Sequence, residues 1–239
     1  MNQVTGTDFV VAERDRIQIE YHRRAREIDA GLYAPWNAAS RFMLETRNRT
    51  AAVMLHRQGV FPRSGHRCLE VGYGSVGWLT ELITWGVSES DLHGIEMDSN
   101  RATKARELLP AADLRIGDAV ELPWEDKTFR LVIASTLFTS VLDNEVRRLI
   151  ASEIERVLAP GGALVWYDFA FNNPRNPNVR GIGRAEVKAL FPHLSGRIRT
   201  ITLAPPLARL IAPRWWTLAS FLESIPLLRT HLIAVLTKK

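Results

Sequence analysis

Gly72, Gly74 and Gly77 occur in the order G-x-G-x-x-G directly after a short apolar run. Glycines at this spacing allow a sharp turn from a strand into a helix and a close approach of the backbone to a nucleotide-type ligand. Glu70 precedes the first glycine, where its charge would repel the pyrophosphate of NAD. The same charge suits a ligand with a positive amino group and no phosphate. The residues therefore favour S-adenosylmethionine over NAD.

Two further acidic positions follow at the expected distances. Glu96 and Asp98 lie 24 and 26 residues after Gly72, where an acid can accept hydrogen bonds from a ribose. Asp118 follows a third apolar run and can accept a hydrogen bond from the amine of adenine. Each acid also has a plainer interpretation, because acids favour helix starts and turns.

The elements that position these residues change character along the chain. Residues 12–29 and 38–59 are rich in helix formers and are separated by the break GLYAPWN. After residue 60, short apolar runs alternate with helical segments, which is typical of βαβ units around a parallel sheet. We count seven strands: five in alternation and two near the end. Expected late elements are a helix over 184–190, strands over 197–203 and 229–239, and an apolar helix near 215–222. LAPGG (158–162) is expected to end the preceding helix.

The motifs LEVGYGSVG, GIEMD, GDAVELPWEDKTFRLVIAS and EIERVLAPGGALVWYDF resemble class I S-adenosylmethionine-dependent methyltransferases, of the bacterial methyltransferase type 11-like kind. The resemblance is strong over residues 67–169. It implies an α/β fold: a doubly wound, Rossmann-like, seven-stranded and mostly parallel sheet with an antiparallel last strand. It also implies cofactor contacts from Glu70, Gly72, Tyr73, Gly74, Glu96, Met97, Asp98, Asp118, Ala119 and Ser135.

Two positions depart from the family pattern. Val76 stands where the family has its third glycine, and Gly77 follows it, which creates the NAD-like spacing. The shift concerns how closely the backbone approaches the methionine part of the cofactor. Arg130 stands where the family commonly has aspartate, a change that concerns packing.

The expected organisation is an N-terminal helical lid over residues 1–60 and a cofactor-binding methyltransferase domain over residues 61–239. No linker-like composition separates the two parts, so we expect them to form one compact unit. The acceptor is expected beside the loops after the fourth and fifth strands. The loop over 169–184 is rich in proline and asparagine, so its polar groups either bind the acceptor or satisfy one another. The substrate-binding candidates are Asn172, Asn173, Arg175 and Arg180.

Methyl transfer to a hydroxyl requires a general base. Asp168, at the end of the fifth strand, is the first candidate and His22 on the lid the second; His22 is also compatible with a solvated helix position. The sequence lacks the Asn-Pro-Pro-Tyr signature that the family uses for nitrogen acceptors. We therefore expect O-methylation of a small-molecule, sugar or natural-product acceptor. The histidines show no metal-ligand spacing, and no metal is expected.

Composition limits the other classes. The net charge of +5 is modest and no basic run is present, so nucleic acid is not an expected partner. The single cysteine, Cys68, suits a reducing cytoplasm. No apolar run is long enough for stable membrane insertion. A homodimer is compatible with the sequence. The apolar stretch 203–228 is expected to pack in the core, with a lipid-facing surface as the alternative.

Two other functions fit parts of the pattern. A NAD-dependent oxidoreductase would explain the glycine spacing, and Glu70 opposes it. A non-catalytic S-adenosylmethionine-binding module would need the cofactor site alone. A usable base near the fifth strand separates an enzyme from such a module.

Overall fold

The computed structural model describes residues 8–74, 77–174 and 176–239. Within these residues seven strands form one sheet in the order β3-β2-β1-β4-β5-β7-β6. All pairs from β3 to β5 are parallel, whereas β7 is antiparallel to both of its neighbours. This confirms the predicted fold class. The strands are β1 (Cys68–Val71), β2 (Leu92–Glu96), β3 (Asp113–Ile116), β4 (Phe129–Ser135), β5 (Leu158–Phe169), β6 (Leu194–Leu203) and β7 (Arg229–Lys238).

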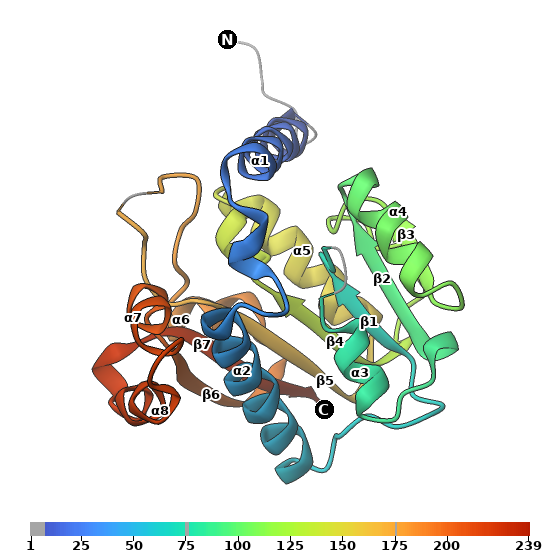
Figure 1. The fold of residues 1–239 in the computed structure, drawn as a ribbon. Helices are drawn as coiled ribbons and strands as arrows, with labels where there is room; N and C mark the ends of the chain where they lie inside the picture. The colour runs from blue at the N-terminus through green and yellow to red at the C-terminus, as the bar shows by residue number, and fades with distance from the viewer. Residues whose placement is uncertain (1–7, 75–76, 175) are drawn as a thin grey trace.

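Helices cover both faces of the sheet and its carboxyl edge (Figure 1). The α-helices are α1 (Asp8–Glu27), α2 (Ala38–Arg57), α3 (Leu79–Thr84), α4 (Ser99–Leu108), α5 (Asn144–Val157), α6 (Arg184–Leu190), α7 (Pro205–Ile211) and α8 (Trp216–Ser224). Four short 3-10 turns complete the described elements: η1 (Ala30–Tyr33), η2 (Glu89–Asp91), η3 (Phe138–Ser140) and η4 (Pro226–Leu228).

The central strands are buried on both faces, as parallel strands between helical layers must be. Every residue of β1 and β2 is buried. Alternate side chains enter two separate cores, one shared with α2, α3 and α4 and the other with α1, α5 and α6. Because side chains alternate along a strand, neighbouring residues such as Leu69 and Glu70 face opposite layers.

The N-terminal helices form as the sequence predicts, with a break between them that contains η1. In Figure 1 α1 lies above the carboxyl ends of the strands, where βα loops gather, whereas α2 lies against a face of the sheet. Ile17 of α1 is buried in the core that includes α5. The role of residues 1–60 as a lid stays a prediction.

Two late elements differ from the expectations. Helix α5 ends at Val157, and LAPGG already belongs to β5, whose pairing with β4 is irregular between Phe129 and Leu131. Strand β6 begins at Leu194, earlier than expected. The predicted single core-packing helix of the apolar stretch is wrong: two short helices form, separated near Pro213, and most of their large apolar side chains are exposed.

Candidate functional site

The glycine turn lies at the carboxyl end of β1. Gly72 and Gly74 have φ angles of 73° and 64°, a conformation that glycine adopts without steric cost. The N–H of Gly72 donates a hydrogen bond to the carbonyl of Ile95 (2.9 Å), which joins the turn to β2. Ser75 and Val76 lie outside the described residues, so the departure at Val76 has no structural account.

Glu96 connects the end of β2 to this turn. One carboxylate oxygen accepts from the N–H of Gly74, and the other accepts from the N–H groups of Met97 and Asp98, each at 2.9 Å. The side chain is buried. Since a carboxylate offers about four acceptor positions, Glu96 can accept a further bond from a ribose hydroxyl. It shapes the turn, and its contact with the ligand stays a prediction.

Glu70 stabilises the segment that follows the turn. It is buried and accepts a hydrogen bond from the N–H of Trp78 (2.7 Å) at the start of α3. Burial raises the pKa of its carboxyl to about 8. The sequence places this acid near a ligand's amino group; the structure directs it to the backbone after the turn. Direct contact with the ligand stays a prediction.

A cation beside the turn comes from α2 and is not evident in the sequence. The guanidinium of Arg47 lies 4.1 Å from the ring centre of Trp78, and the charge of Glu70 acts on it. Burial lowers the pKa of Arg47 from its ordinary value. A cation at this position is a suitable partner for the carboxylate of an amino-acid moiety. Its contribution depends on the packing of α2, which no local pattern reveals.

A small cavity of about 40 Å³ lies between α1 and the loops after β2, β3 and β4. Asp118 lines it and accepts a hydrogen bond from the N–H of Val120 (3.1 Å), so it is both a turn residue and available to a ligand. Met97 and Ala119 also line this cavity. It is far smaller than the several hundred cubic ångströms of a typical ligand pocket. The cavity as it stands is too small for S-adenosylmethionine.

Tyr21 of α1 is the side chain that closes the region above Glu96. The guanidinium carbon of Arg101 lies 4.4 Å from its ring centre. Burial raises the pKa of Tyr21, and the charge of Glu96 raises it further. This residue was not identified from the sequence, because an aromatic residue on an amphipathic helix is usually a packing residue.

Three other predicted cofactor residues have structural partners. Tyr73 is buried in the core against Gly94, and among the described residues its hydroxyl has no hydrogen-bond partner. Asp98 caps α4 by accepting from the N–H of Arg101 (3.0 Å). Ser135 ends β4 and pairs with Tyr167 of β5. Tyr73 therefore contributes to packing. Asp98 acts as the N-cap of α4, which is the plainer interpretation given above for this acid.

Asp168 holds the segment after β4. It is fully buried; one oxygen accepts from the N–H of Thr139 (3.0 Å), and the other accepts from the Thr139 hydroxyl and from the N–H of Phe169. Burial raises the pKa of this carboxyl to about 7. Its oxygens are directed to η3, so the geometry gives Asp168 a positioning role and does not support the general-base prediction.

The raised pKa of Asp168 predicts a pH-dependent stability. Between the ordinary pKa of 3.8 and about 7 the folded protein keeps a proton that the unfolded chain has lost. The free energy of unfolding therefore falls as pH rises through this window, by up to about 1.4 kcal/mol per pH unit from this group. Chemical unfolding at several pH values should show this slope, and Asp168→Asn should flatten it. An unchanged slope in Asp168→Asn, matching the exposed control Glu125→Gln, would contradict the assignment.

The second candidate base and two of the acceptor-binding candidates lie on different elements. His22 is exposed on α1. Asn172 accepts from the N–H of Gly181 (2.9 Å), and Arg180 binds Asn144 and Glu186 (2.8 and 2.7 Å). The bond of Asn172 closes the loop upon itself, and the bonds of Arg180 join the loop to α5 and α6.

Two further loop candidates remain. The backbone carbonyl of Asn173 accepts from the N–H of Asn176 (3.0 Å). Arg175 lies outside the described residues. Asn178, which the sequence did not single out, donates to Glu20 of α1 (2.8 Å) and so connects this loop to the N-terminal helix.

The residues at the carboxyl edge fit S-adenosylmethionine. Glu96 contacts the glycine turn, Asp118 lines the cavity after β3, and Arg47 lies beside Trp78 after the turn. Within the described ranges no group of three histidine, cysteine or acidic side chains is arranged to hold a metal ion. Burial raises the pKa of the Cys68 thiol to about 12, which makes it unreactive.

Comparison with known proteins agrees with this site. Residues 69–166 match the family model described as methyltransferase domain. The chain is 34% identical over 131 residues to phthiotriol/phenolphthiotriol dimycocerosates methyltransferase 1 of Mycobacterium ulcerans, covering 53% of this chain and 46% of that protein. It is 32% identical over 106 residues to demethylmenaquinone methyltransferase of Staphylococcus aureus, covering 43% of each. The chain thus spans about half the length of the curated relatives it matches.

A solved structure shares the fold over most of the chain. Phosphoethanolamine N-methyltransferase 2 of Haemonchus contortus, in complex with S-adenosyl-L-methionine, superposes with a TM-score of 0.58 at 15% identity, covering 80% of this chain and 52% of that one. At this identity the likeness concerns the fold. The family match spans β1 to the middle of β5, which includes Glu70, Glu96 and Asp118. Over these residues the chain is similar to the methyltransferase domain, in agreement with the predicted resemblance to class I S-adenosylmethionine-dependent methyltransferases.

Proposed function

We propose that this protein transfers a methyl group from S-adenosylmethionine to an oxygen atom of a small-molecule, sugar or natural-product acceptor. The observation that carries the proposal is Glu96, a buried carboxylate hydrogen-bonded to the glycine turn beside the cavity that Asp118 lines. When bound, the cofactor supplies an electrophilic methyl group on a sulfonium. The acceptor oxygen is inferred from the sequence, which lacks the motif used for nitrogen acceptors.

The chain's own residues have distinct tasks in this proposal. Glu96 accepts hydrogen bonds from the ribose, and Asp118 accepts one from the adenine amine. Arg47 pairs with the carboxylate of the methionine moiety, while Glu70 keeps the turn in shape. Catalysis of such a displacement consists mainly of alignment and exclusion of water. These tasks belong to the cofactor residues and to α1.

The end of β4 is the position we assign to the acceptor. Thr136 is exposed and has a φ of 53°, which is unusual for a β-branched residue. Its N–H donates to the carbonyl of Tyr167 (2.7 Å), which holds the conformation. Backbone outliers of this kind cluster at active sites. Because Asp168 is committed to η3, His22 is the candidate base in this proposal.

Helix α1 closes the site through two buried acids. Glu13 accepts from the N–H groups of Leu142 and Asp143, and Glu20 accepts from Asn178. The two contacts join α1 to the loops after β4 and β5, which surround the proposed acceptor position. Breaking one of them releases the helix without touching the cofactor residues.

Glu13→Ala is therefore expected to raise the population in which α1 is open by about tenfold, since a hydrogen bond to a charged group contributes roughly 1.5–3 kcal/mol. Limited trypsin digestion within α1 should accelerate, and release of S-adenosylhomocysteine should be faster in stopped-flow measurements. Asp15→Ala, on the exposed side of the same helix, is the matched control. Equal digestion rates for Glu13→Ala and Asp15→Ala would show that the contact does not hold α1.

The proposed function is tested by titration followed by a transfer assay. Calorimetry with S-adenosylhomocysteine and separately with NADH should show binding of the first alone. Methyl-labelled S-adenosylmethionine is then incubated with a panel of hydroxyl, amine and carbon acceptors. Label in an ether or ester product supports the proposal, and label in amine or carbon products alone overturns the choice of oxygen. Binding without transfer to any class favours the non-catalytic module.

A further inference from the structure

The two helices between β6 and β7 fully bury only alanines, and several of their large apolar side chains are exposed. Helices α7 and α8 bury alanines against α2 and the end of β6, whereas a surface helix normally buries its large apolar residues. Leu227, just after them, is 94% exposed. We call this region the α7–α8 surface; its exposed apolar residues are Leu210, Trp215, Trp216, Leu218, Phe221 and Leu227.

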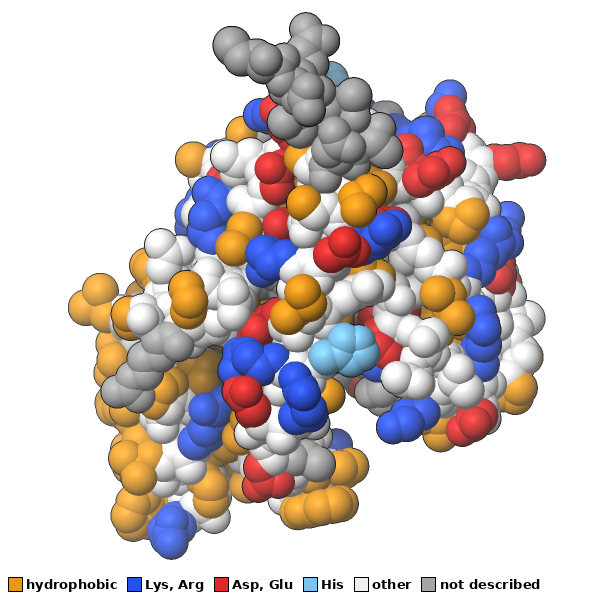
Figure 2. Space-filling model, turned by 90° about the horizontal axis from the view of Figure 1, so that it is seen from above, with side chains coloured by type: hydrophobic (Ala, Val, Ile, Leu, Met, Phe, Trp, Pro, Cys, Tyr) orange, Lys and Arg blue, Asp and Glu red, His pale blue; other side chains and the backbone are white. Residues whose placement is uncertain are grey.

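The exposed apolar side chains of the α7–α8 surface form a patch. Figure 2 shows hydrophobic side chains gathered at the lower left of the face seen from above, on the side where Figure 1 places α7 and α8. Isolated exposed apolar residues are ordinary, but a gathering of tryptophan, phenylalanine and leucine marks an interaction surface.

The charge of the same region is positive. Arg209 and Arg214 are exposed among the apolar residues. The single acid of residues 204–228 is Glu223, and its carboxylate accepts from the Thr46 hydroxyl (2.9 Å) and from the N–H of Leu203 (3.2 Å). This acid therefore faces α2 and β6. An apolar surface with two arginines and no outward acid is complementary to an anionic partner.

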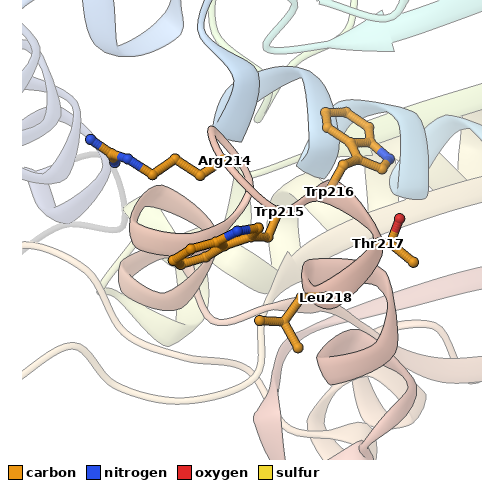
Figure 3. A pocket seen from close by; sticks show the side chains of 5 residues that line it. All are labelled: Arg214, Trp215, Trp216, Thr217 and Leu218. Carbon is orange, nitrogen blue, oxygen red and sulfur yellow. The ribbon is translucent and has the colours of Figure 1, made fainter.

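The surface also contains a cleft and a rigid anchor. A cleft of about 480 Å³ is lined by Arg214, Trp215, Trp216, Thr217 and Leu218. In Figure 3 Trp216 points toward α2, and Trp215 and Arg214 extend away from it. Trp216 makes an edge contact with Phe42 of α2, with 5.1 Å between ring centres. The cleft thus combines an apolar wall, a guanidinium and a fixed orientation.

We propose that the α7–α8 surface docks this protein on an anionic lipid bilayer. Tryptophan and phenylalanine enter the headgroup boundary, and arginines contact the lipid phosphates, as in interfacial amphipathic helices. The attachment is peripheral: across the described part of the chain no helix is long and apolar enough to cross a membrane. Docking adds a lipid surface to the protein's partners and does not depend on the proposed methyl transfer.

Sedimentation of the full chain with vesicles tests this proposal. Vesicles of phosphatidylcholine with about 30% phosphatidylglycerol, an anionic surface, should retain the protein, and pure phosphatidylcholine should retain much less. Trp215→Ser/Phe221→Ser should reduce partitioning at least about tenfold, because both side chains lose their apolar contact with lipid. Arg209→Gln and Arg214→Gln should each reduce it about fivefold on the anionic vesicles.

Matched controls use exposed residues at the opposite edge of the sheet. Leu108→Ser and Lys104→Gln on α4 should partition as the unmodified chain does. Absence of binding to anionic vesicles, or equal loss in the α4 and α7–α8 variants, overturns the proposal. A dimer in solution that Trp215→Ser/Phe221→Ser dissociates, without lipid binding, shows instead that the surface joins two copies. S-adenosylhomocysteine affinity should be unchanged in all these variants, which separates this test from that of the proposed function.

Discussion

Replacing Glu96 by alanine is expected to weaken binding of S-adenosylhomocysteine at least about 100-fold. The carboxylate holds the N–H groups of Gly74, Met97 and Asp98 and is the proposed acceptor for the ribose. Hydrogen bonds to a charged group contribute roughly 1.5–3 kcal/mol each, and about 2.7 kcal/mol already corresponds to 100-fold. Isothermal titration calorimetry measures this loss directly.

The same substitution should also lower the free energy of unfolding by about 2–4 kcal/mol, because it leaves backbone donors of the turn without their acceptor. Titrations must therefore be run well below the melting temperature of the variant. Glu96→Gln keeps one acceptor oxygen, so its affinity and stability should lie between those of Glu96→Ala and those of the unmodified protein. Glu107→Gln, exposed on the following helix, is the control. Affinity of Glu96→Ala within about threefold of the unmodified protein would remove Glu96 from the cofactor site.

Gly77→Ala is expected to produce the second large effect. A Cβ atom at this position would lie 2.1 Å from one carboxylate oxygen of Glu70 and 2.4 Å from the other, at a φ of 20°. Either the carboxyl group moves and loses the N–H of Trp78, or the turn shifts. We expect a loss of about 2–4 kcal/mol in the free energy of unfolding and weaker cofactor binding, measured by chemical denaturation and calorimetry.

A double-mutant cycle separates the clash with Glu70 from the cost of replacing any glycine by alanine. Gly77→Ala/Glu70→Ala removes the clashing carboxylate, so it should be destabilised by at least about 1 kcal/mol less than the sum of the single variants. Gly183→Ala is the control, because no atom lies within 4 Å of its Cβ position and its φ is ordinary. Strict additivity of the two substitutions would show that the Cβ atom does not meet Glu70.

Asp168 and His22 illustrate how far sequence patterns reach into the site. The position of Asp168 at the end of β5 was predictable from the apolar run before it. Its burial against Thr139 was not, because η3 follows β4 and reaches Asp168 only when the two strands pair. His22 shows the reverse: its helix was predictable, but its exposure depends on which face of α1 meets the sheet.

The sequence by itself determined the strand–helix alternation, the glycine turn and the acids at the ends of β1, β2 and the loop after β3. These features are local: strand and helix periodicities, and a glycine's access to positive φ, depend on neighbouring residues only. The family resemblance rested on the same segments, and the sheet order and the antiparallel β7 agree with it.

Tertiary structure alone decided what each of these side chains touches. Arg47 contacts Trp78 because α2 packs against a face of the sheet, and Tyr21 lies near Glu96 because α1 lies over the carboxyl edge. The apolar stretch 203–228 could have been buried by its composition. Prolines divide it into two short helices that fully bury alanines, and several large side chains on their other sides are exposed. Contacts between segments distant in the chain leave no pattern in the local sequence. Here such contacts decide whether the stretch is a core helix or an exposed surface.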